Sequence, residues 1–153
     1  MFKGKTKIDW ILHYIVDGCD CPECNKESDN YISDMQKKYP FFGNCHTHGL
    51  EDHNHTEMVL CLNMGDKEMA NLLNSFGVIL LEKNLPRLEH DKEYEGFLSG
   101  GYKIKTYQPD NCPVVFIFMP DKNHKFPGDE GCEFPYCNQK LYADLIIEDK
   151  GYV

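Results

Sequence analysis

The stretch Asn44-Cys-His-Thr-His-Gly-Leu-Glu-Asp-His-Asn-His-Thr-Glu57 lies between segments that predict two buried strands. It holds one cysteine, four of the chain's seven histidines and three acidic residues within fourteen positions. If Asn44 to Leu50 is a strand, alternation places His46 and His48 on one face and Cys45 on the other. This stretch therefore predicts a strand and a polar hairpin end that can bind a metal or a ligand.

Apolar periodicity in the rest of the chain predicts an α+β fold. Further strands are expected at Trp10 to Val16, Met58 to Asn63, Phe97 to Leu98, Tyr102 to Tyr107 and Val114 to Met119. Helical spacing predicts a short helix from about Asn30 to Tyr39 and a main amphipathic helix from Asp66, which Gly77 can end early. Leu141 to Ile147 fits a final short strand or helix.

The length of 153 residues predicts one domain spanning residues 1–153. We expect a single compact domain with a mostly antiparallel sheet, one main amphipathic helix and a Cys-rich N-terminal loop over residues 18–30. The Val114 to Met119 segment is apolar throughout, which predicts a central position in the sheet.

Composition bounds the possible partners. The chain has 41% hydrophobic residues and a net charge of -9, and its sixteen Lys and Arg are scattered rather than clustered. General nucleic-acid binding is therefore not expected. No run approaches the ~20 apolar residues that a membrane span needs. The early apolar run is interrupted by His13 and lacks a cleavage site, so we expect a cytoplasmic protein with reduced thiols.

The eight cysteines include a cluster at Cys19, Cys21 and Cys24 on a turn-rich segment. A tight loop can direct several thiolates at one tetrahedral metal, so the cluster predicts a structural zinc whose fourth ligand is Cys45 or His46. One alternative is a redox dithiol formed by Cys21 and Cys24. Another is a set of thiols that bind no metal.

The histidine-rich hairpin supports a second chemistry. His46, His48 and His55 could hold a catalytic metal, with water at its remaining position and Glu57 as general base. The simpler interpretation is that these polar residues are hydrogen-bonded at a hairpin end. Under that interpretation no residue of the chain is assigned a catalytic role.

The segment from Pro120 to Cys137 contains three prolines, two glycines and three aromatic residues beyond a buried strand. This composition favours a long ordered loop, and such loops often carry function. We expect Asp121, Lys122 and Phe126 to bind ligand together with His46, His48 and His55. Cys132 and Cys137 with His124 could form a second metal site.

Several short motifs together resemble a family of small bacterial and phage proteins catalogued as domain of unknown function four-two-six-two. The motifs are His48-Gly49-Leu50, His55-Thr-Glu57, Ala70-Asn-Leu-Leu-Asn-Ser75, Gly100-Gly-Tyr102, Pro120-Asp-Lys-Asn-His-Lys-Phe-Pro127, Gly131-Cys132 and Gln139. They cover a core of about residues 43–141. Thr56 replaces a proline that the family favours, and the cysteine-rich loop departs from the family pattern. The resemblance implies a compact α+β domain and no established activity.

These observations favour a cytosolic, zinc-stabilised binding module that recognises a small molecule or a protein partner through the histidine-rich hairpin and the 121–137 loop. The first alternative is a metal-dependent hydrolase that uses the hairpin. The second is a thiol redox protein that uses Cys21 and Cys24. The sequence does not identify the ligand.

Overall fold

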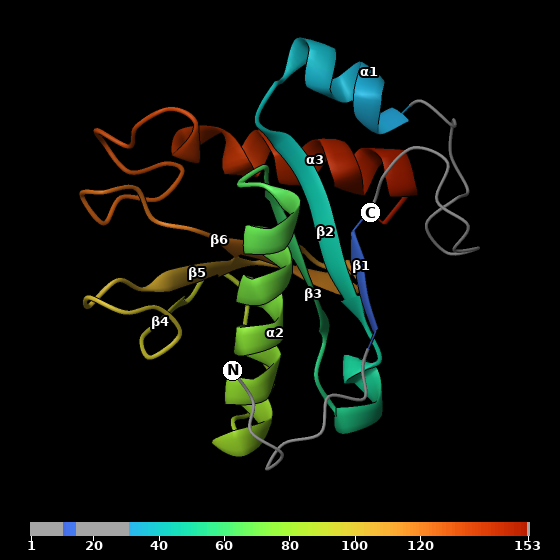
Figure 1. The fold of residues 1–153 in the computed structure, drawn as a ribbon, viewed down its shortest axis with the longest axis vertical. Coiled ribbons are helices and arrows are strands. Elements are labelled where there is room, and N and C mark those ends of the chain that lie inside the picture. The colour runs from blue at the N-terminus through green and yellow to red at the C-terminus, as the bar shows by residue number, and fades with distance from the viewer. Residues whose placement is uncertain (1–10, 15–30, 153) are drawn as a thin grey trace.

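The computed structural model describes residues 11–14 and 31–152. These residues form a six-stranded sheet in the order β1-β2-β3-β6-β5-β4 (Figure 1). The strands are β1 (Ile11–Tyr14), β2 (Phe42–His48), β3 (Glu57–Leu62), β4 (Glu93–Tyr94), β5 (Ile104–Tyr107) and β6 (Val114–Phe118). The helices are α1 (Tyr31–Lys38), α2 (Asp66–Glu82) and α3 (Gln139–Lys150), with 3-10 turns η1 (Leu50–His53) and η2 (Tyr136–Asn138).

The sheet is mixed. The central strands β3 and β6 pair in parallel, whereas the neighbouring pairs on both sides are antiparallel. The α+β class is confirmed, but the prediction of a mostly antiparallel sheet missed the parallel pair at its centre. The physical reason is connectivity: β3 continues into α2, and the chain returns through the β5–β6 hairpin so that β6 runs alongside β3.

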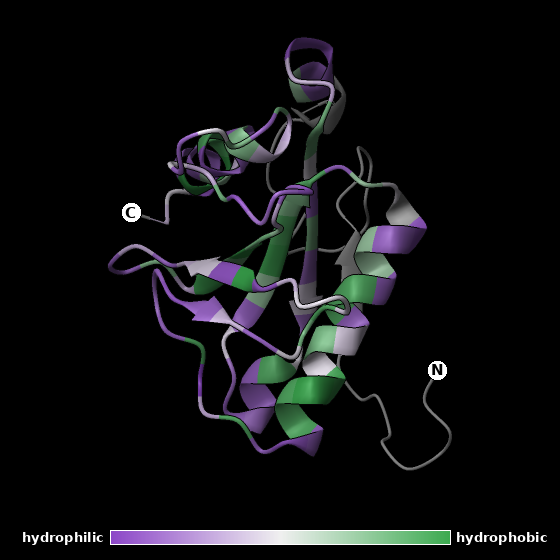
Figure 2. Cartoon of the chain, turned by 90° about the vertical axis from the view of Figure 1, so that its left-hand side faces the viewer, coloured by the Kyte–Doolittle hydropathy of each residue, from purple (hydrophilic) through white to green (hydrophobic). Residues whose placement is uncertain are grey.

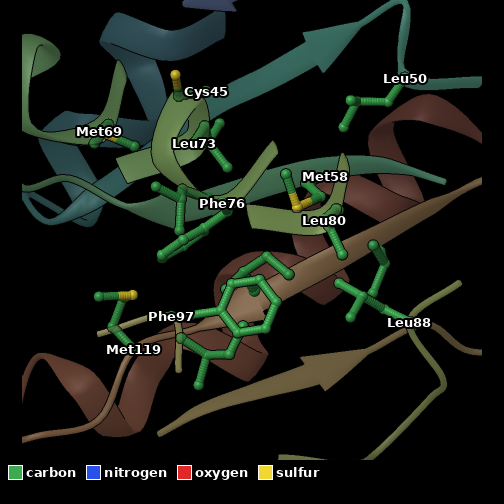
Figure 3. Close-up of a cluster of buried hydrophobic side chains, with 14 of the residues drawn as sticks. Cys45, Leu50, Met58, Met69, Leu73, Phe76, Leu80, Leu88, Phe97 and Met119 are labelled. Carbon is green, nitrogen blue, oxygen red and sulfur yellow. The ribbon is translucent and has the colours of Figure 1, made fainter. Parts of the chain in front are cut away.

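Alternation along the central strands divides the core into two layers. Met58 and Leu60 of β3 pack with Phe76 of α2 in one buried cluster, which Figure 3 shows in close-up. Val59 and Cys61, the intervening residues, pack with Tyr142 of α3 in the other cluster. Figure 2 shows hydrophobic residues concentrated in the central strands, where both faces of the sheet are covered.

The main helix α2 continues through Gly77 to Glu82, so the glycine does not end it. Its apolar positions Met69, Leu73, Phe76 and Leu80 are all buried against the sheet. Burial of this stripe offsets the cost of about 1 kcal/mol that glycine carries in a helix interior. The early end at Gly77, which the sequence left open, therefore does not occur.

The opposite face is covered by α3, which makes it a second main helix where the sequence left strand and helix open. It buries Tyr142, Ala143, Ile146 and Ile147, and it ends at Lys150, after which the left-handed φ of 69° at Gly151 suits a glycine cap. The segment Phe97 to Leu98, for which the sequence predicts a strand, forms a bend. Phe97 is instead buried against Phe76 on the α2 face of the sheet.

The remaining predicted elements lie close to their expected positions. The short helix, the strands around 42–48, 57–62, 104–107 and 114–118 and the β5–β6 pairing are all present. The apolar strand β6 is central, between β3 and β5. The cysteine-rich loop lies outside the described residues, and only residues 11–14 of the first predicted strand are described.

Candidate functional site

The first site is a cavity of about 330 Å³, which we call the carboxyl-end cavity. Its lining residues are Met64, Leu98, Ser99, Tyr102, Met119, Pro120, Asp121, Lys122 and Tyr136. Met64 lies just after β3, and Met119 lies just after β6. The cavity therefore lies at the carboxyl ends of the two parallel strands.

The connectivity explains why space is left at this end of the sheet. After β3 the chain passes to α2 on one face, and after β6 it leads to α3 on the other face (Figure 1). Met64 and Tyr136 contact both core clusters, as expected for residues at the boundary between the layers. Crevices at such switch points bind ligands in open α/β sheets.

Asp121 organises the rim of the carboxyl-end cavity. Its Oδ1 accepts hydrogen bonds from the backbone N–H of Asn123 (2.8 Å) and Lys125 (2.9 Å), and its Oδ2 accepts one from Glu133 (2.9 Å). Burial alone would raise the pKa of Asp121, but these N–H groups, with the Lys125 charge, lower that pKa below its usual value. The carboxylate therefore joins two distant parts of the 120–137 loop.

Side-chain contacts fix the rest of this loop. Gln139 Nε2 donates to the carbonyl of Met119 (2.7 Å), and the N–H of Met119 donates to Gln139 Oε1 (2.8 Å). The ring of His124 stacks on Tyr102 with centroids 4.2 Å apart, and Tyr102 Oη donates to the carbonyl of Lys122 (3.1 Å). The cavity is therefore bounded by a loop with defined geometry.

The chemical character of the carboxyl-end cavity is mixed. Met64, Leu98 and Met119 supply aliphatic and thioether surface, and Tyr136 adds an aromatic ring. The polar residues of the lining are Ser99, Tyr102, Asp121 and Lys122, and the Asp121 carboxylate is engaged by backbone N–H groups of the loop. The ammonium of Lys122 is exposed and lies 3.8 Å from Glu133 Oε2, a separation that leaves it accessible to a second anionic partner.

The second site, the histidine cavity, has a volume of about 200 Å³ and lies on the α3 face of the sheet. It is lined by Asn44, His46, Thr47, His48, Glu57, Val59, Val114, Ile146, Lys150 and Tyr152. The Nε2 atoms of His46 and His48 are 2.9 Å apart, and their rings meet edge to face. The prediction that these histidines share one face is confirmed.

Glu57 lines the histidine cavity but is heavily engaged. Its Oε1 accepts from Thr47 Oγ1 (2.7 Å) and the Leu50 N–H (3.2 Å). Its Oε2 accepts from the N–H groups of Gly49 (2.9 Å) and Glu51 (3.2 Å). The carboxylate therefore caps the first turn of η1, a role that the spacing did not distinguish from that of a general base.

His55 is not among the residues that line the histidine cavity. It is buried, and burial lowers its pKa, with further lowering by the charge of Arg87 and by His53. Its Nδ1 has no hydrogen-bond partner within the described part of the chain. The structure thus brings His46, His48 and Glu57 together and places His55 separately.

Of the four cysteines that we expect to bind zinc, the structure describes only Cys45. Cys19, Cys21 and Cys24 lie outside the described residues, so their zinc site remains a prediction. Cys45 is buried on the α2 face with Leu73 nearby in the same cluster (Figure 3).

The residues of the second predicted metal site, His124, Cys132 and Cys137, lie within the 120–137 loop. Burial, reinforced by the Asp121 carboxylate and by Cys137, raises the pKa of Cys132 to about 11, so this thiol is protonated at neutral pH. Across the side chains that the structure describes, no three His, Cys, Asp or Glu residues are grouped to hold a metal ion.

The predicted ligand-binding residues of the loop separate into two places. Asp121 and Lys122 line the carboxyl-end cavity, whereas Phe126 is buried and borders a smaller cavity of about 180 Å³ with His124 and Lys103. Sequence reasoning missed the apolar walls, including Met64 and Met119. Met64 follows one predicted strand and Met119 is the last residue of another, but only the parallel pairing of those strands brings the two methionines together.

Within the described residues, no helix is both long and apolar enough to cross a membrane. Comparison with family models, with curated proteins and with solved structures finds no match to this chain. The resemblance to the family of unknown function therefore stays a prediction, and the functional argument rests on the two cavities themselves.

Proposed function

We propose that this protein is a non-enzymatic binding module that holds a small molecule in the carboxyl-end cavity. The observation that carries the proposal is the position of this cavity at the carboxyl ends of the parallel pair β3 and β6. Its volume of about 330 Å³ falls within the range of small-molecule sites. Hydrogen bonds of Asp121 and Gln139 hold the loop at its rim, which reduces the entropy cost of binding.

The lining defines the class of ligand. Met64, Met119 and Leu98 favour an aromatic or aliphatic group, because thioether and aliphatic surfaces adapt to flat apolar ligands. The Lys122 ammonium and the Ser99 hydroxyl favour a polar or anionic group at the rim. We therefore expect a ligand with one apolar body and one polar or anionic end, such as an aromatic carboxylic acid.

Methyl NMR provides a direct test. The chain has six methionines, and Met64 and Met119 line the cavity whereas Met58 and Met69 are fully buried in the core. Protein labelled at the methionine methyl groups is titrated with a panel of small aromatic carboxylic acids and their neutral amides. We expect ligands to shift the Met64 and Met119 resonances and to leave the Met58 and Met69 resonances in place.

Two variants sharpen this test. Lys122→Ala should weaken binding of the acids more than binding of the amides, because it removes a charge at the rim. Lys67→Ala, an exposed position on α2, is the matched control and should change neither. If no ligand shifts Met64 or Met119, or if both substitutions act equally, the carboxyl-end cavity is not the binding site.

The proposal retains a structural zinc at Cys19, Cys21 and Cys24, with Cys45 or His46 as fourth ligand. Its support is the density of thiols in the sequence. Cys21→Ser should lower both the zinc content per chain and the melting temperature. An unchanged melting curve together with no zinc in the wild-type protein would exclude it.

A further inference from the structure

A second cavity adjoins the carboxyl-end cavity. It has a volume of about 180 Å³, and we call it the small cavity. Its lining residues are Glu93, Gly101, Lys103, Pro120, His124 and Phe126. Pro120 lines the carboxyl-end cavity as well, and Gly101 directly precedes Tyr102, which lines that larger cavity. The two cavities are therefore neighbours that share part of their walls.

A stacked pair of rings separates the two cavities. Tyr102 lines the carboxyl-end cavity, whereas His124 lines the small cavity. Their ring centroids are 4.2 Å apart, and the ring planes are inclined by 15°. Because the rings are in contact and each belongs to the wall of a different cavity, the pair lies between the two spaces.

The two members of this pair are held to different degrees. Tyr102 is partly buried, and its Oη donates to the carbonyl of Lys122 (3.1 Å). His124 is exposed, and among the described residues its side chain makes no hydrogen bond or ion pair beyond the stack on Tyr102. The imidazole is therefore the part of the partition that can be removed without breaking other contacts.

The backbone fixes the position of His124. Its N–H donates to the carbonyl of Asp121 (3.0 Å), and Asp121 Oδ1 accepts from the N–H groups of Asn123 (2.8 Å) and Lys125 (2.9 Å) on either side. The φ of His124 is 65°, a left-handed value that glycine adopts without steric cost. The turn therefore does not depend on the imidazole, and glycine can replace His124 without strain.

The small cavity offers an aromatic surface. Phe126, which is only 2% exposed, supplies this surface. Lys103 and Glu93 form a long ion pair of 4.0 Å beside it, with side chains 45% and 47% exposed. Aromatic rings attract one another in offset and edge-to-face contacts. The small cavity therefore suits a flat aromatic group that packs on Phe126.

We propose, on the basis of the function proposed for the carboxyl-end cavity, that the small cavity is a second compartment of the same ligand site and that His124 sets the size of the ligand. With the imidazole stacked on Tyr102, the site takes an anion with a single ring. Without the imidazole, a second ring of the ligand extends past Pro120 to Phe126. His124 thus determines specificity for size, whereas Lys122 selects for charge.

Two matched acids test this assignment. Benzoic acid and biphenyl-3-carboxylic acid share the carboxylate and the first ring and differ in the second ring. Each is titrated into the full-length wild-type protein and into His124→Gly, with the Met64 and Met119 methyl resonances as the readout. We expect His124→Gly to bind the biphenyl acid about 10-fold more tightly than the wild-type protein does, since burial of a further ring contributes at least this much. The affinity for benzoic acid should stay unchanged.

Two further variants control for the change at the backbone. Asn111→Gly places glycine at another exposed left-handed position, with a φ of 68°, in the turn between β5 and β6. It should leave the affinity for both acids at the wild-type value. His124→Asn also removes the ring, and asparagine tolerates a left-handed φ. It should raise the affinity for the biphenyl acid in the same direction as His124→Gly, by a smaller factor.

The possible outcomes separate the partition from the binding function itself. In His124→Gly, the biphenyl acid should shift the ring resonances of Phe126, and benzoic acid should not. If benzoic acid binds but His124→Gly gains no affinity for the biphenyl acid, or if Asn111→Gly gains as much, the partition is overturned and the proposed function stands. If neither acid shifts Met64 or Met119 in any of these proteins, the proposed function fails and the partition fails with it.

Discussion

The side-chain amide of Gln139 binds the backbone of Met119 at both its N–H and its carbonyl, as a neighbouring strand would. Gln139 is fully buried, and its Nε2 also donates to the carbonyl of Tyr136 (3.1 Å). This contact extends the hydrogen bonding of β6 beyond its last residue. It also fixes the wall of the carboxyl-end cavity on which Met119 lies.

Replacement of Gln139 should therefore be costly. Gln139→Leu leaves the N–H and carbonyl of Met119 without these partners in a buried setting, at about 1–3 kcal/mol for each group. We expect the free energy of unfolding to fall by about 2–5 kcal/mol in urea titrations. Gln108→Leu, which removes a single bond to the carbonyl of Cys112, should cost at most about 1.5 kcal/mol. Equal losses in the two variants would contradict the role assigned to Gln139.

Glu57 should behave as a structural residue. Glu57→Gln replaces one accepting oxygen by an NH₂ group that faces backbone N–H donors at the start of η1. Hydrogen bonds to a charged group are worth about 1.5–3 kcal/mol each, so we expect a loss of about 2–4 kcal/mol in the free energy of unfolding.

The same hairpin offers a control for this substitution. Glu51→Gln alters a half-exposed ion pair with Arg87 and should cost less than about 1 kcal/mol. Chemical denaturation of both variants measures the difference. A neutral effect of Glu57→Gln on stability would return Glu57 to the list of candidate general bases.

Local patterns predicted the contacts that depend on short spacing. His46 and His48 lie on one face because a strand repeats every second residue, whatever its neighbours are. The same rule identified β6 as a buried central strand, because its residues are apolar on both faces. Helix α2 was recognised from its apolar stripe, whereas its continuation past Gly77 was left open because it depends on packing.

Contacts that depend on long-range pairing could not be predicted. The carboxyl-end cavity needs β3 and β6 to be parallel neighbours, and the chain between them forms a helix and two strands. The residue types at Met64 and Met119 do not indicate that these two strands pair. The role of Glu57 was also hidden, since a carboxylate near histidines has the same spacing whether it caps a turn or serves as a base.

His55 should make stability depend on pH. Its pKa in the folded protein is lowered, because burial and then the charge of Arg87 disfavour the protonated ring. The unfolded chain therefore takes up a proton near pH 6.5 while the folded protein does not, and stability falls as the pH drops below about 6.5. Urea unfolding between pH 5 and pH 8 should show that His55→Gln reduces this slope. A slope that survives in His55→Gln would assign the effect to other groups.

Asp121 should control the order of the 120–137 loop. Asp121→Asn keeps an oxygen for the N–H groups of Asn123 and Lys125 but presents an NH₂ group to the N–H of Glu133. Hydrogen–deuterium exchange should therefore show faster exchange at Glu133 than in the wild-type protein, and a smaller change at the other two amides. Because the folded pKa lies below the ordinary 3.8, the wild-type loop should be fully stabilised above pH 3.8 and lose this contribution as the pH falls through the folded value.

The control for this experiment is Asp110→Asn, an exposed carboxylate in the turn between β5 and β6. It should leave the exchange rates of the 120–137 loop unchanged. If the Asp121 side chain did not contribute to the structure of the loop, Asp121→Asn would also leave these exchange rates unchanged. Faster exchange confined to Glu133 in Asp121→Asn would instead show that one buried carboxylate holds the two sides of the loop together, and with them the rim of the cavity in which we place the ligand.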